Sequence, residues 1–337
     1  MMIVNKAAVA IVGAAIAVIG FVGAAFAFGD KAQNETNSTE PVTTTYSRPT
    51  QSAPEQTSGD KKYKFRDDME VILVMGIDDT EKRPDDNEYV HSSQADVLYV
   101  YAIDHKNKTF QTLQINRETM ADVKQILGIG EDDVASMQIC LAHSYGRTEN
   151  ARCLNVCDSV SGLIFDVPID HYISFNMSAI SVINEQVGGV TVTVPAGMEK
   201  ADPEFKEGAQ VTLKGKQAEL FVRSRMSLTD DSNIFRMQRQ EIFMSAWKQQ
   251  AYKKLTEESG FAAKFVLALS EYMTSDMTAS RLSELANTLK EYKDLGTLTT
   301  EGETLEEGEG RLFREFHVNE EDLHKKVLEL FYEEVPA

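Results

Sequence analysis

The chain has 337 residues, of which 42% are hydrophobic and 26% are charged. This composition is that of ordinary globular protein, and the length allows one large domain or two small ones. The formal net charge of −19 argues against a nucleic-acid partner, because no overall basic field exists to attract phosphates of a duplex.

The N-terminus carries an apolar run without a charge at residues 7–28 (AAVAIVGAAIAVIGFVGAAFAF). At about 1.5 Å per helical residue the run spans a hydrocarbon core of roughly 30 Å, as a membrane anchor would. The triplet Ala25-Phe26-Ala27 instead has the form of a signal-peptide cleavage site. The run exceeds the usual core of a signal peptide, which favours the anchor.

The composition of the chain after the expected anchor changes once, near residue 62. Residues 29–62 are rich in Thr, Ser, Asn, Gln and Pro and hold few large apolar residues, so they indicate a flexible stalk. We therefore expect a cytoplasmic tail (1–6), a transmembrane anchor (7–28), an extracellular stalk (29–65) and one extracellular domain (66–337). The protein is expected to be a single-pass protein of the cell membrane.

Strand-like and helix-like segments alternate in the expected extracellular domain. Residues 70–77 (EVILVMGI) predict a buried strand, residues 78–94 a polar loop, and residues 95–103 and 109–115 a hairpin. Further helices are expected at 178–187, 214–223, 235–255, 262–272, 279–292 and 320–333, with helical periodicity over 137–165, a strand at 190–194 and a short strand pair near 296–300 and 312–318. Interleaved strands and helices predict a layered α-β-α domain.

Two aspartates stand where neighbouring strands would meet. Asp78 follows the first strand and Asp96 begins the second. If these strands pair, the two carboxylates lie together and repel each other unless a cation or a proton lies between them. Hard oxygen ligands suit Mg²⁺. Aspartate is also common at strand ends for reasons of turn formation alone. Arg117, at the end of the third strand, would face the same edge of the sheet.

Four arginines lie within residues 223–240 of this acidic chain, at positions 223, 225, 236 and 239. Guanidinium groups hold phosphate in a bidentate fork, so the segment suggests a phosphorylated ligand, whereas a surface face of ion pairs is the alternative. Arg236 and Gln240 share a helical face. Arg223 and Arg225 converge only if the helix ends near Arg223.

The three cysteines leave two alternatives open. An exported domain permits one disulfide from Cys140 to Cys153 or Cys157, with one thiol left over. Three buried, unpaired thiols are the alternative. Without a histidine pair or a second cysteine pair, the spacing does not favour a zinc site.

Eight motifs occur in the order and spacing of a known family. They are GID (76–78), AD (95–96), INRET (115–119), HSYG (143–146), PIDHYISFN (168–176), GGVTVTVP (188–195), LKGKQAELFVRSR (213–225) and RMQRQ (236–240). From about residue 68 onward the chain resembles the LytR-CpsA-Psr family, whose members transfer glycopolymers from an undecaprenyl-pyrophosphate carrier to peptidoglycan. The resemblance implies a layered α-β-α fold with a central mixed sheet, an apolar pocket for the polyprenyl chain and a polar mouth for pyrophosphate.

Carried over by position, the resemblance implies a site at the mouth of that pocket. Asp78 and Asp96 would bind Mg²⁺, or Mn²⁺. The substrate-binding residues would be Arg117, Arg223, Arg225, Arg236, Arg239 and Gln240. Arg117, Arg223, Arg225 and Asp96 would also act in catalysis. The family often has arginine where this chain has Gln94, so one basic contact near the metal is missing.

The expected activity is phosphotransfer at the outer face of the membrane. The partners would be an undecaprenyl-pyrophosphate-linked glycan (teichoic acid, capsule or similar), peptidoglycan and the cell membrane. Arginines and metal would offset charge on the phosphates, and either Asp96 or Glu118 could serve as base. The alternatives are a polyprenyl-pyrophosphate hydrolase, in which water replaces the wall acceptor, and a non-catalytic regulator that binds lipid-linked phosphate.

Overall fold

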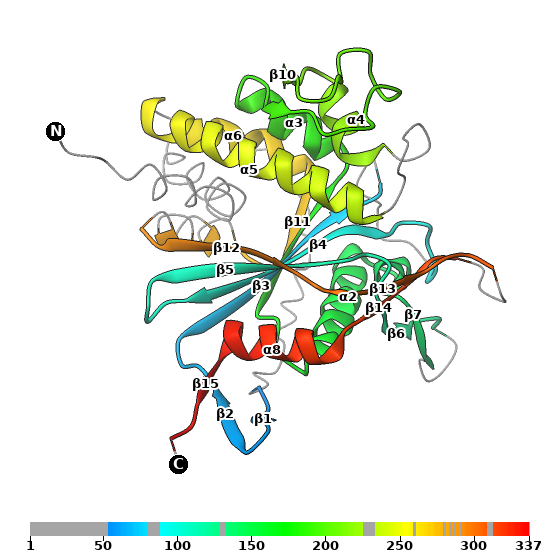
Figure 1. Ribbon diagram of the computed structural model, residues 1–337, viewed down its shortest axis with the longest axis vertical. Helices are drawn as coiled ribbons and strands as arrows, with labels where there is room; N and C mark the ends of the chain where they lie inside the picture. Colours follow the sequence, from blue (N-terminus) through cyan, green and yellow to red (C-terminus); the bar gives the residue numbers. More distant parts are fainter. Residues whose placement is uncertain are drawn as a thin grey trace, which may run out of the picture.

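A six-stranded mixed sheet forms the centre of the molecule (Figure 1). The computed structural model describes residues 53–79, 88–128, 133–224, 233–258, 261–278, 281–282, 285, 288–289, 291–308 and 313–336. In sheet order the strands are β11 (Met273–Ser275), β8 (His171–Asn176), β3 (Met69–Ile77), β4 (Ala95–Asp104), β5 (Thr109–Ile115) and β12 (Lys293–Thr299). β8 runs parallel to β3 and β12 parallel to β5, while the other neighbours are antiparallel.

The strands are buried on both faces of the sheet. In β3, Ile72 and Val74 pack into one hydrophobic cluster, and Val71, Leu73 and Met75 pack into another on the opposite face. Because side chains alternate along a strand, an unbroken apolar run of this kind requires a covering layer on each side. The expected α-β-α layering and the hairpin of β4 and β5 are both confirmed.

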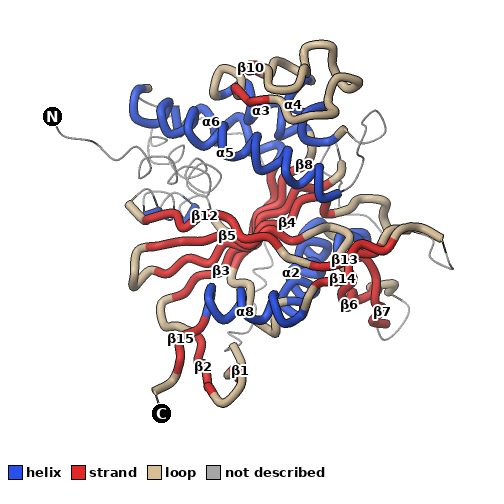
Figure 2. The backbone as a smooth tube through the Cα atoms, viewed as in Figure 1, coloured by secondary structure: helices blue, strands red, loops and turns tan. Residues whose placement is uncertain are grey.

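Helices cover each face of the sheet (Figure 2). One layer holds α3 (Ser178–Gln186), α4 (Gln217–Arg223), α5 (Asn233–Glu257), α6 (Phe261–Leu269) and the 3₁₀ turn η2 (Ser270–Tyr272). Trp247 of α5 anchors this layer, because it is fully buried, donates from Nε1 to the Ile183 carbonyl at 3.0 Å and packs on Phe265. The other layer holds α2 (Glu149–Leu163), α8 (Glu320–Phe331) and the 3₁₀ helix η1 (Ile139–Ser144).

The expected stalk ends earlier than its composition indicated. Strands β1 (Gln56–Ser58) and β2 (Lys61–Phe65) lie within the range 29–65 and form a three-stranded sheet with β15 (Tyr332–Glu334). Phe65 stacks on Phe331 and meets Tyr332 edge-on, so this segment is fixed to the end of the chain despite its polar composition. The expected anchor at 7–28 lies outside the described residues, within which no helix is long and apolar enough to cross a membrane.

Two other expectations about the elements require correction. The segments near 296–300 and 312–318 are not a strand pair, because β12 joins β5 of the central sheet and β14 (Glu315–Val318) pairs with β13 (Gly302–Leu305). The periodicity over 137–165 also includes the end of β7 (Asp133–Gln138), which forms a hairpin with β6 (Met120–Gln125). A further hairpin joins β9 (Thr191–Thr193) and β10 (Gln210–Thr212).

Three strand ends meet at one edge of the central sheet. Ile77 at the end of β3 lies opposite Ala95 of β4 on one side and Asn176 of β8 on the other. The register shifts between Gly76 and Ile77, and a Cβ on Gly76 would lie 3.0 Å from the Cβ of Val97. Glycine therefore permits the close approach that brings the end of β3 beside the start of β4.

Candidate active site

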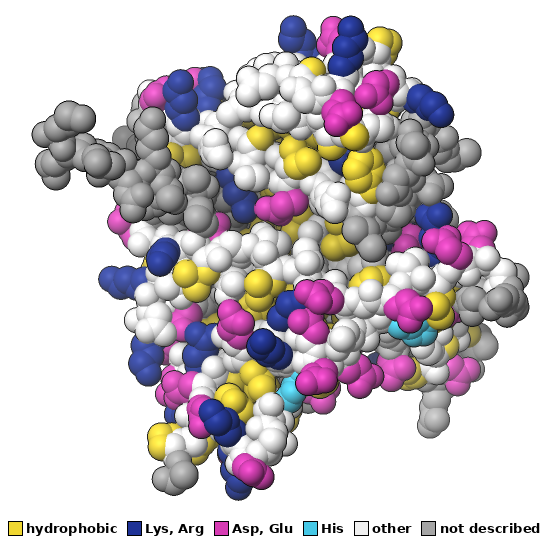
Figure 3. Space-filling model, in the orientation of Figure 1, with side chains coloured by type: hydrophobic (Ala, Val, Ile, Leu, Met, Phe, Trp, Pro, Cys, Tyr) yellow, Lys and Arg dark blue, Asp and Glu magenta, His cyan; other side chains and the backbone are white. Residues whose placement is uncertain are grey.

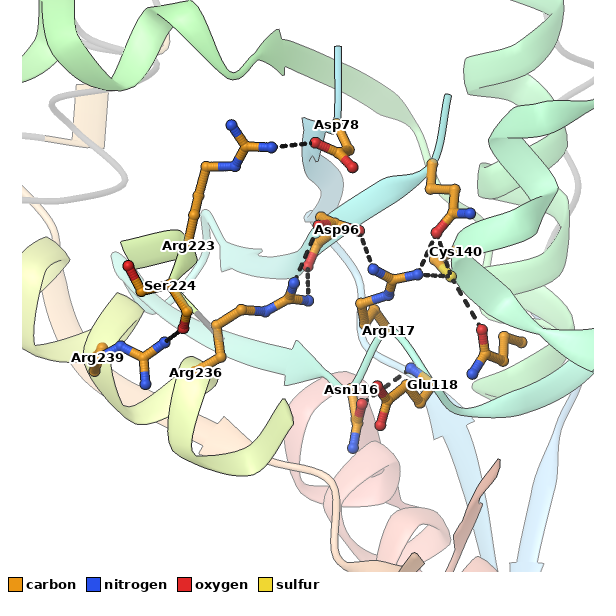
Figure 4. Close-up of polar contacts among 12 residues, drawn as sticks. Asp78, Asp96, Asn116, Arg117, Glu118, Cys140, Arg223, Ser224, Arg236 and Arg239 are labelled. Atoms are coloured by element: carbon orange, nitrogen blue, oxygen red, sulfur yellow. Dashed lines mark hydrogen bonds and ion pairs between the residues drawn. The ribbon is translucent and has the colours of Figure 1, made fainter. Parts of the chain in front are cut away.

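Asp96 is the centre of a buried ion-pair group (Figure 4). Its Oδ1 lies 2.5 Å from Nη1 of Arg117, and its Oδ2 lies 3.0 Å from Nη1 of Arg236. The two arginines come from the turn after β5 and from the first turn of α5. One carboxylate thus holds two guanidinium groups together, and they would repel each other in its absence.

The surroundings of Arg117 fix its direction. Its Nη2 donates to the side-chain oxygen of Gln94 and to Sγ of Cys140, which lies 3.1 Å away. Burial raises the pKa of the Cys140 thiol to about 11, so this neighbour is neutral near pH 7. Members of the family often have arginine at the position of Gln94. In this chain Gln94 instead accepts a hydrogen bond from Arg117.

All three cysteines are buried and none forms a disulfide, so the second sequence alternative holds. Cys153 lies near His143 and Glu149, and their ligand atoms are within 4.8 Å of one another. Within the described parts of the chain this is the one such group of three. Glu149 is already paired with Arg152 at 2.9 Å, so the group belongs to a buried ion-pair network at the start of α2.

A second ion pair joins Arg223 and Asp78. Nη2 of Arg223 lies 2.6 Å from Oδ1 of Asp78, and Nη1 lies 2.5 Å from Oε1 of Glu219. Arg223 is the last residue of α4, and Asp78 is held beside Gln94 because its amide donates to the Gln94 carbonyl at 2.8 Å. This pair is about one-third exposed, in contrast to the buried group around Asp96.

Both ion-pair groups border an apolar cavity. Its polar lining residues are Asp96, Asn176, Arg223, Arg236 and Gln240. The apolar remainder of the lining comes from β3, β4, β8, α3, α4 and α5: Val74, Met75, Val97, Tyr99, Phe175, Met177, Ala179, Ile180, Ile183, Val222, Phe243 and Met244. The cavity volume is about 110 Å³, below the range of roughly 300–1,000 Å³ usual for ligand pockets. A larger apolar ligand would have to displace part of the cavity wall.

Arg239 has different partners from Arg236, although both lie on α5. It is fully buried, with Nε donating to the Phe221 carbonyl at 2.9 Å and Nη2 to the Ser224 carbonyl at 2.5 Å. Its guanidinium also lies over the ring of Phe235. Figure 4 shows its guanidinium group on the carbonyl group of Ser224, apart from Asp96. In the described structure this side chain therefore joins α4 to α5, and the expectation that Arg239 binds substrate stays a prediction.

Arg225 lies outside the described residues. The helix α4 does end at Arg223, as convergence of the two arginines requires.

Asn176 is a candidate site residue that the sequence did not single out. It ends β8, beside Ile77, and lines the same cavity as Arg236. The side chain is 8% exposed, and neither its Oδ1 nor its Nδ2 has a hydrogen-bond partner among the described residues. A buried amide without partners is unfavourable unless a ligand supplies them. The signal available in the sequence was its position at the end of the PIDHYISFN motif.

The donor type of Asp78 and Asp96 fits Mg²⁺, which uses one or two carboxylates together with substrate phosphates. In the described structure each of these carboxylates is held by arginine. A cation could bind both only if the arginines turned to another anion. The arrangement thus suits a site in which metal and phosphate enter together.

Residues 31–326 match the LytR_cpsA_psr family. The chain belongs to this family. The match covers most of the chain and confirms the resemblance carried by the eight motifs, and the mixed sheet with a helical layer on each face is the fold of its solved members.

Curated relatives of the chain carry transferase names. The "Polyisoprenyl-teichoic acid--peptidoglycan teichoic acid transferase TagU" of Halalkalibacterium halodurans is 29% identical over 46% of this chain and 44% of the relative. TagU of Bacillus cereus is 27% identical over 66% of this chain and 64% of the relative. The matches thus span less than two thirds of either relative. A solved structure of "TagT bound to LIIa-WTA" has a TM-score of 0.56 at 21% identity, over 78% of this chain and 90% of that one.

Proposed function

We propose that the protein is a phosphotransferase that moves a glycopolymer from a polyprenyl-pyrophosphate carrier to peptidoglycan. The observation that carries the proposal is the pairing of Arg117 and Arg236 on Asp96 beside an apolar cavity that Arg223 also lines. Three guanidinium groups next to an apolar cavity fit a pyrophosphate attached to a hydrocarbon chain. The transferase names of the relatives support the same reaction.

The reaction is a displacement at the sugar-linked phosphorus. A hydroxyl oxygen of the acceptor forms a new bond to this phosphorus, and the bond to the bridging oxygen of the pyrophosphate breaks. Polyprenyl phosphate leaves with the bond electrons, and the hydroxyl proton passes to a base. The product is a phosphodiester between the glycopolymer and the acceptor. Charge stabilisation by positioned cations supplies most of the catalysis in such transfers.

The arginines would exchange partners when substrate binds. In the described structure, Arg117 and Arg236 lie on Asp96, and Arg223 lies on Asp78. A pyrophosphate offers more negative charge than either carboxylate, so the guanidinium groups would turn toward it. The freed Asp78 and Asp96 would then hold Mg²⁺ or Mn²⁺, which supplies further neutralisation of phosphate charge. Asp96 or Glu118 remains the candidate base.

The cavity would take the first part of the polyprenyl chain. Most of its lining is apolar, and its space is too small for a long lipid unless part of the wall moves. A membrane anchor at residues 7–28 would hold this domain outside the cell at the membrane that contains the carrier, and so raise its effective concentration.

The test is an assay with a labelled polyprenyl-pyrophosphate-linked glycan and peptidoglycan. The expected product is label joined to peptidoglycan through a phosphodiester. Release of free phosphorylated glycan alone, with acceptor present, would indicate the hydrolase instead. Undiminished transfer by the Arg117→Ala, Arg223→Ala double variant would overturn the catalytic site as drawn.

The metal has its own test. Treatment with a chelator should stop transfer, and added Mg²⁺ or Mn²⁺ should restore it. In the Asp78→Asn variant the concentration of Mg²⁺ needed for half-maximal rate should rise. Transfer that continues undiminished after chelation would contradict metal binding by Asp78 and Asp96 without affecting the role of the arginines.

A further inference from the structure

A second, larger depression lies on the other side of α5. Its volume is about 1,170 Å³, and its walls come from α5, the edge strand β12, the hairpin β13–β14 and the residues at the end of β5. Figure 3 looks onto this face, with α5 above and β12 below, where neutral atoms make up most of the middle of the surface. We call this depression the α5–β12 groove.

The groove and the apolar cavity lie on opposite sides of the same helix. Arg236, Gln240 and Met244, at helical spacing, face the cavity. Met237 and Glu241, offset by one residue, face the groove. On the sheet, Gln114 lines the groove and Tyr99 lines the cavity. The Gln114 side chain donates to the Tyr99 hydroxyl at 3.1 Å, so these two side chains lie between the groove and the cavity.

The groove begins at the active site. Two of its lining residues, Asn116 and Met237, are the chain neighbours of Arg117 and Arg236. These are the two arginines that Asp96 joins. A molecule lying along the groove therefore has one end next to the phosphate-binding groups, on the side opposite the cavity.

The chemistry of the groove differs from that of the phosphate site. Its described lining has three carboxylates, Glu241, Glu301 and Glu303, and neither lysine nor arginine. Lys326 pairs with Glu301 at 3.5 Å but is not part of the lining. The rest of the lining combines amide and hydroxyl groups with His317 and with apolar side chains of α5 and β14. Such a surface repels an anionic chain and offers hydrogen-bond acceptors to hydroxyl and amide N–H groups.

We propose that the α5–β12 groove binds the acceptor, as an uncharged strand of N-acetylated sugars. The inference rests on the proposed function, because it assigns the second substrate of the same reaction. The strand lies along α5 and β12, and its end places a sugar hydroxyl beside Arg117 and Arg236. The donor lipid approaches from the other side of α5, so the two substrates meet at Asp96 from opposite directions. The anionic part of the donor glycopolymer is kept out of the groove by Glu241, Glu301 and Glu303.

The first test narrows the groove. Thr299 is exposed, lies on the edge strand and lines the groove, so Thr299→Trp fills it without touching the arginines. Thr193→Trp is the matched control, because Thr193 is also an exposed strand threonine and lines neither the groove nor the cavity. With the full chain in membranes, we expect Thr299→Trp to raise the KM for peptidoglycan at least about tenfold, a loss of about 1.4 kcal/mol, and to leave donor affinity unchanged. Thr193→Trp should change neither.

The second test needs no reaction. Chitohexaose, an uncharged oligomer of N-acetylglucosamine, should bind the protein and perturb the backbone resonances of residues 297–303 and 316–319. A hyaluronan hexasaccharide, which carries a carboxylate on alternate sugars, should bind at least about tenfold more weakly. Glu241→Gln, which keeps the shape of the side chain, should weaken chitohexaose binding and reduce the discrimination against hyaluronan.

The outcomes separate the two proposals. If Thr299→Trp weakens donor binding as much as acceptor use, the groove holds donor sugars and the acceptor assignment is wrong. Equal binding of chitohexaose and hyaluronan, or resonance changes confined to other residues, would also overturn it. If the wild-type protein transfers nothing but binds chitohexaose in the groove, the proposed function fails and the groove remains a glycan site.

Discussion

Arg236 forms a 3.0 Å ion pair with Asp96 although 140 positions separate them in the chain, and both side chains are more than nine-tenths buried. Asp96 is also paired with Arg117. Removal of Asp96 and removal of Arg236 should therefore have different effects on stability. Asp96→Ala leaves two buried guanidinium groups together without the carboxylate that they share. Arg236→Met leaves Asp96 still paired.

We therefore expect Asp96→Ala to lower the free energy of unfolding by about 3–5 kcal/mol, as the removal of one partner from a buried pair does, and Arg236→Met to lower it by clearly less. Urea unfolding of both variants measures the difference. Equal losses would mean that Arg117 does not compensate for the loss of Arg236. Both variants should lack transfer activity.

The ion pair of Arg223 with Asp78 should matter for activity rather than for stability. Pairs this exposed contribute at most about 1 kcal/mol, so Arg223→Ala should unfold at nearly the wild-type urea concentration. Loss of a cation that stabilises a transferring phosphate lowers kcat by about 10²–10³-fold. Glu219→Gln is the control, because it removes the other partner of Arg223 and leaves its charge. A similar loss of rate in the control would assign Arg223 to the positioning of α4.

Arg239 should show the opposite behaviour. It is fully buried and donates to the carbonyl groups of Phe221 and Ser224. Arg239→Ala should lower the free energy of unfolding by about 2–4 kcal/mol, because charged hydrogen bonds are lost and buried carbonyl groups lose a donor. Lysine at this position cannot reach both carbonyl groups and should not restore stability. A stable Arg239→Ala variant with a raised KM for the donor would indicate that Arg239 binds the substrate.

The contrast between Arg236 and Arg239 marks the limit of sequence reasoning for this site. Both match the RMQRQ motif, and their charge and spacing are equally compatible with phosphate binding. Arg239 lies three residues after Arg236 on α5, so its side chain leaves the helix in a different direction. Only the packing of α4 on α5 determines that the Arg239 guanidinium group donates to carbonyl groups at the end of α4. The hairpin of β4 and β5 was predictable, because a short connection makes this pairing local. The pairing of β3 with β4, which brings Asp78 near Asp96, was only a condition of the argument, because residues 78–94 separate the two strands. The pairing of β12 with β5 was not predictable, because the pairing is formed between segments distant in sequence.

Asn176 offers a test of ligand binding that is separate from charge. Its buried amide has no partner among the described residues, so Asn176→Leu, of similar size, should leave the free energy of unfolding unchanged or raise it. If the amide binds the donor, the same variant should raise the KM for the donor about tenfold, as expected for one hydrogen bond. Thermal unfolding and donor kinetics measure the two effects. A destabilised variant with unchanged KM would make Asn176 a structural residue.

Glu149 should make the stability of the domain depend on pH in the acid range. Burial alone would raise the pKa of this carboxyl, but the hydrogen bonds and charges of His143 and Arg152 outweigh burial and lower the pKa to about 2. Because the pKa is lowered in the folded state, the stabilisation is present above the ordinary value of 4.5 and is lost as the pH falls from 4.5 toward 2. A shift of this size corresponds to about 3 kcal/mol.

Urea unfolding between pH 7 and pH 3 should therefore show a loss of stability in the wild-type domain that is smaller in Glu149→Gln. The glutamine variant should already be less stable at pH 7, because His143 and Arg152 lose their shared carboxylate. Asp158→Asn, on the exposed side of the same helix, is the control and should retain the wild-type slope. Parallel pH profiles for wild type and Glu149→Gln would show that acid acts through other carboxylates.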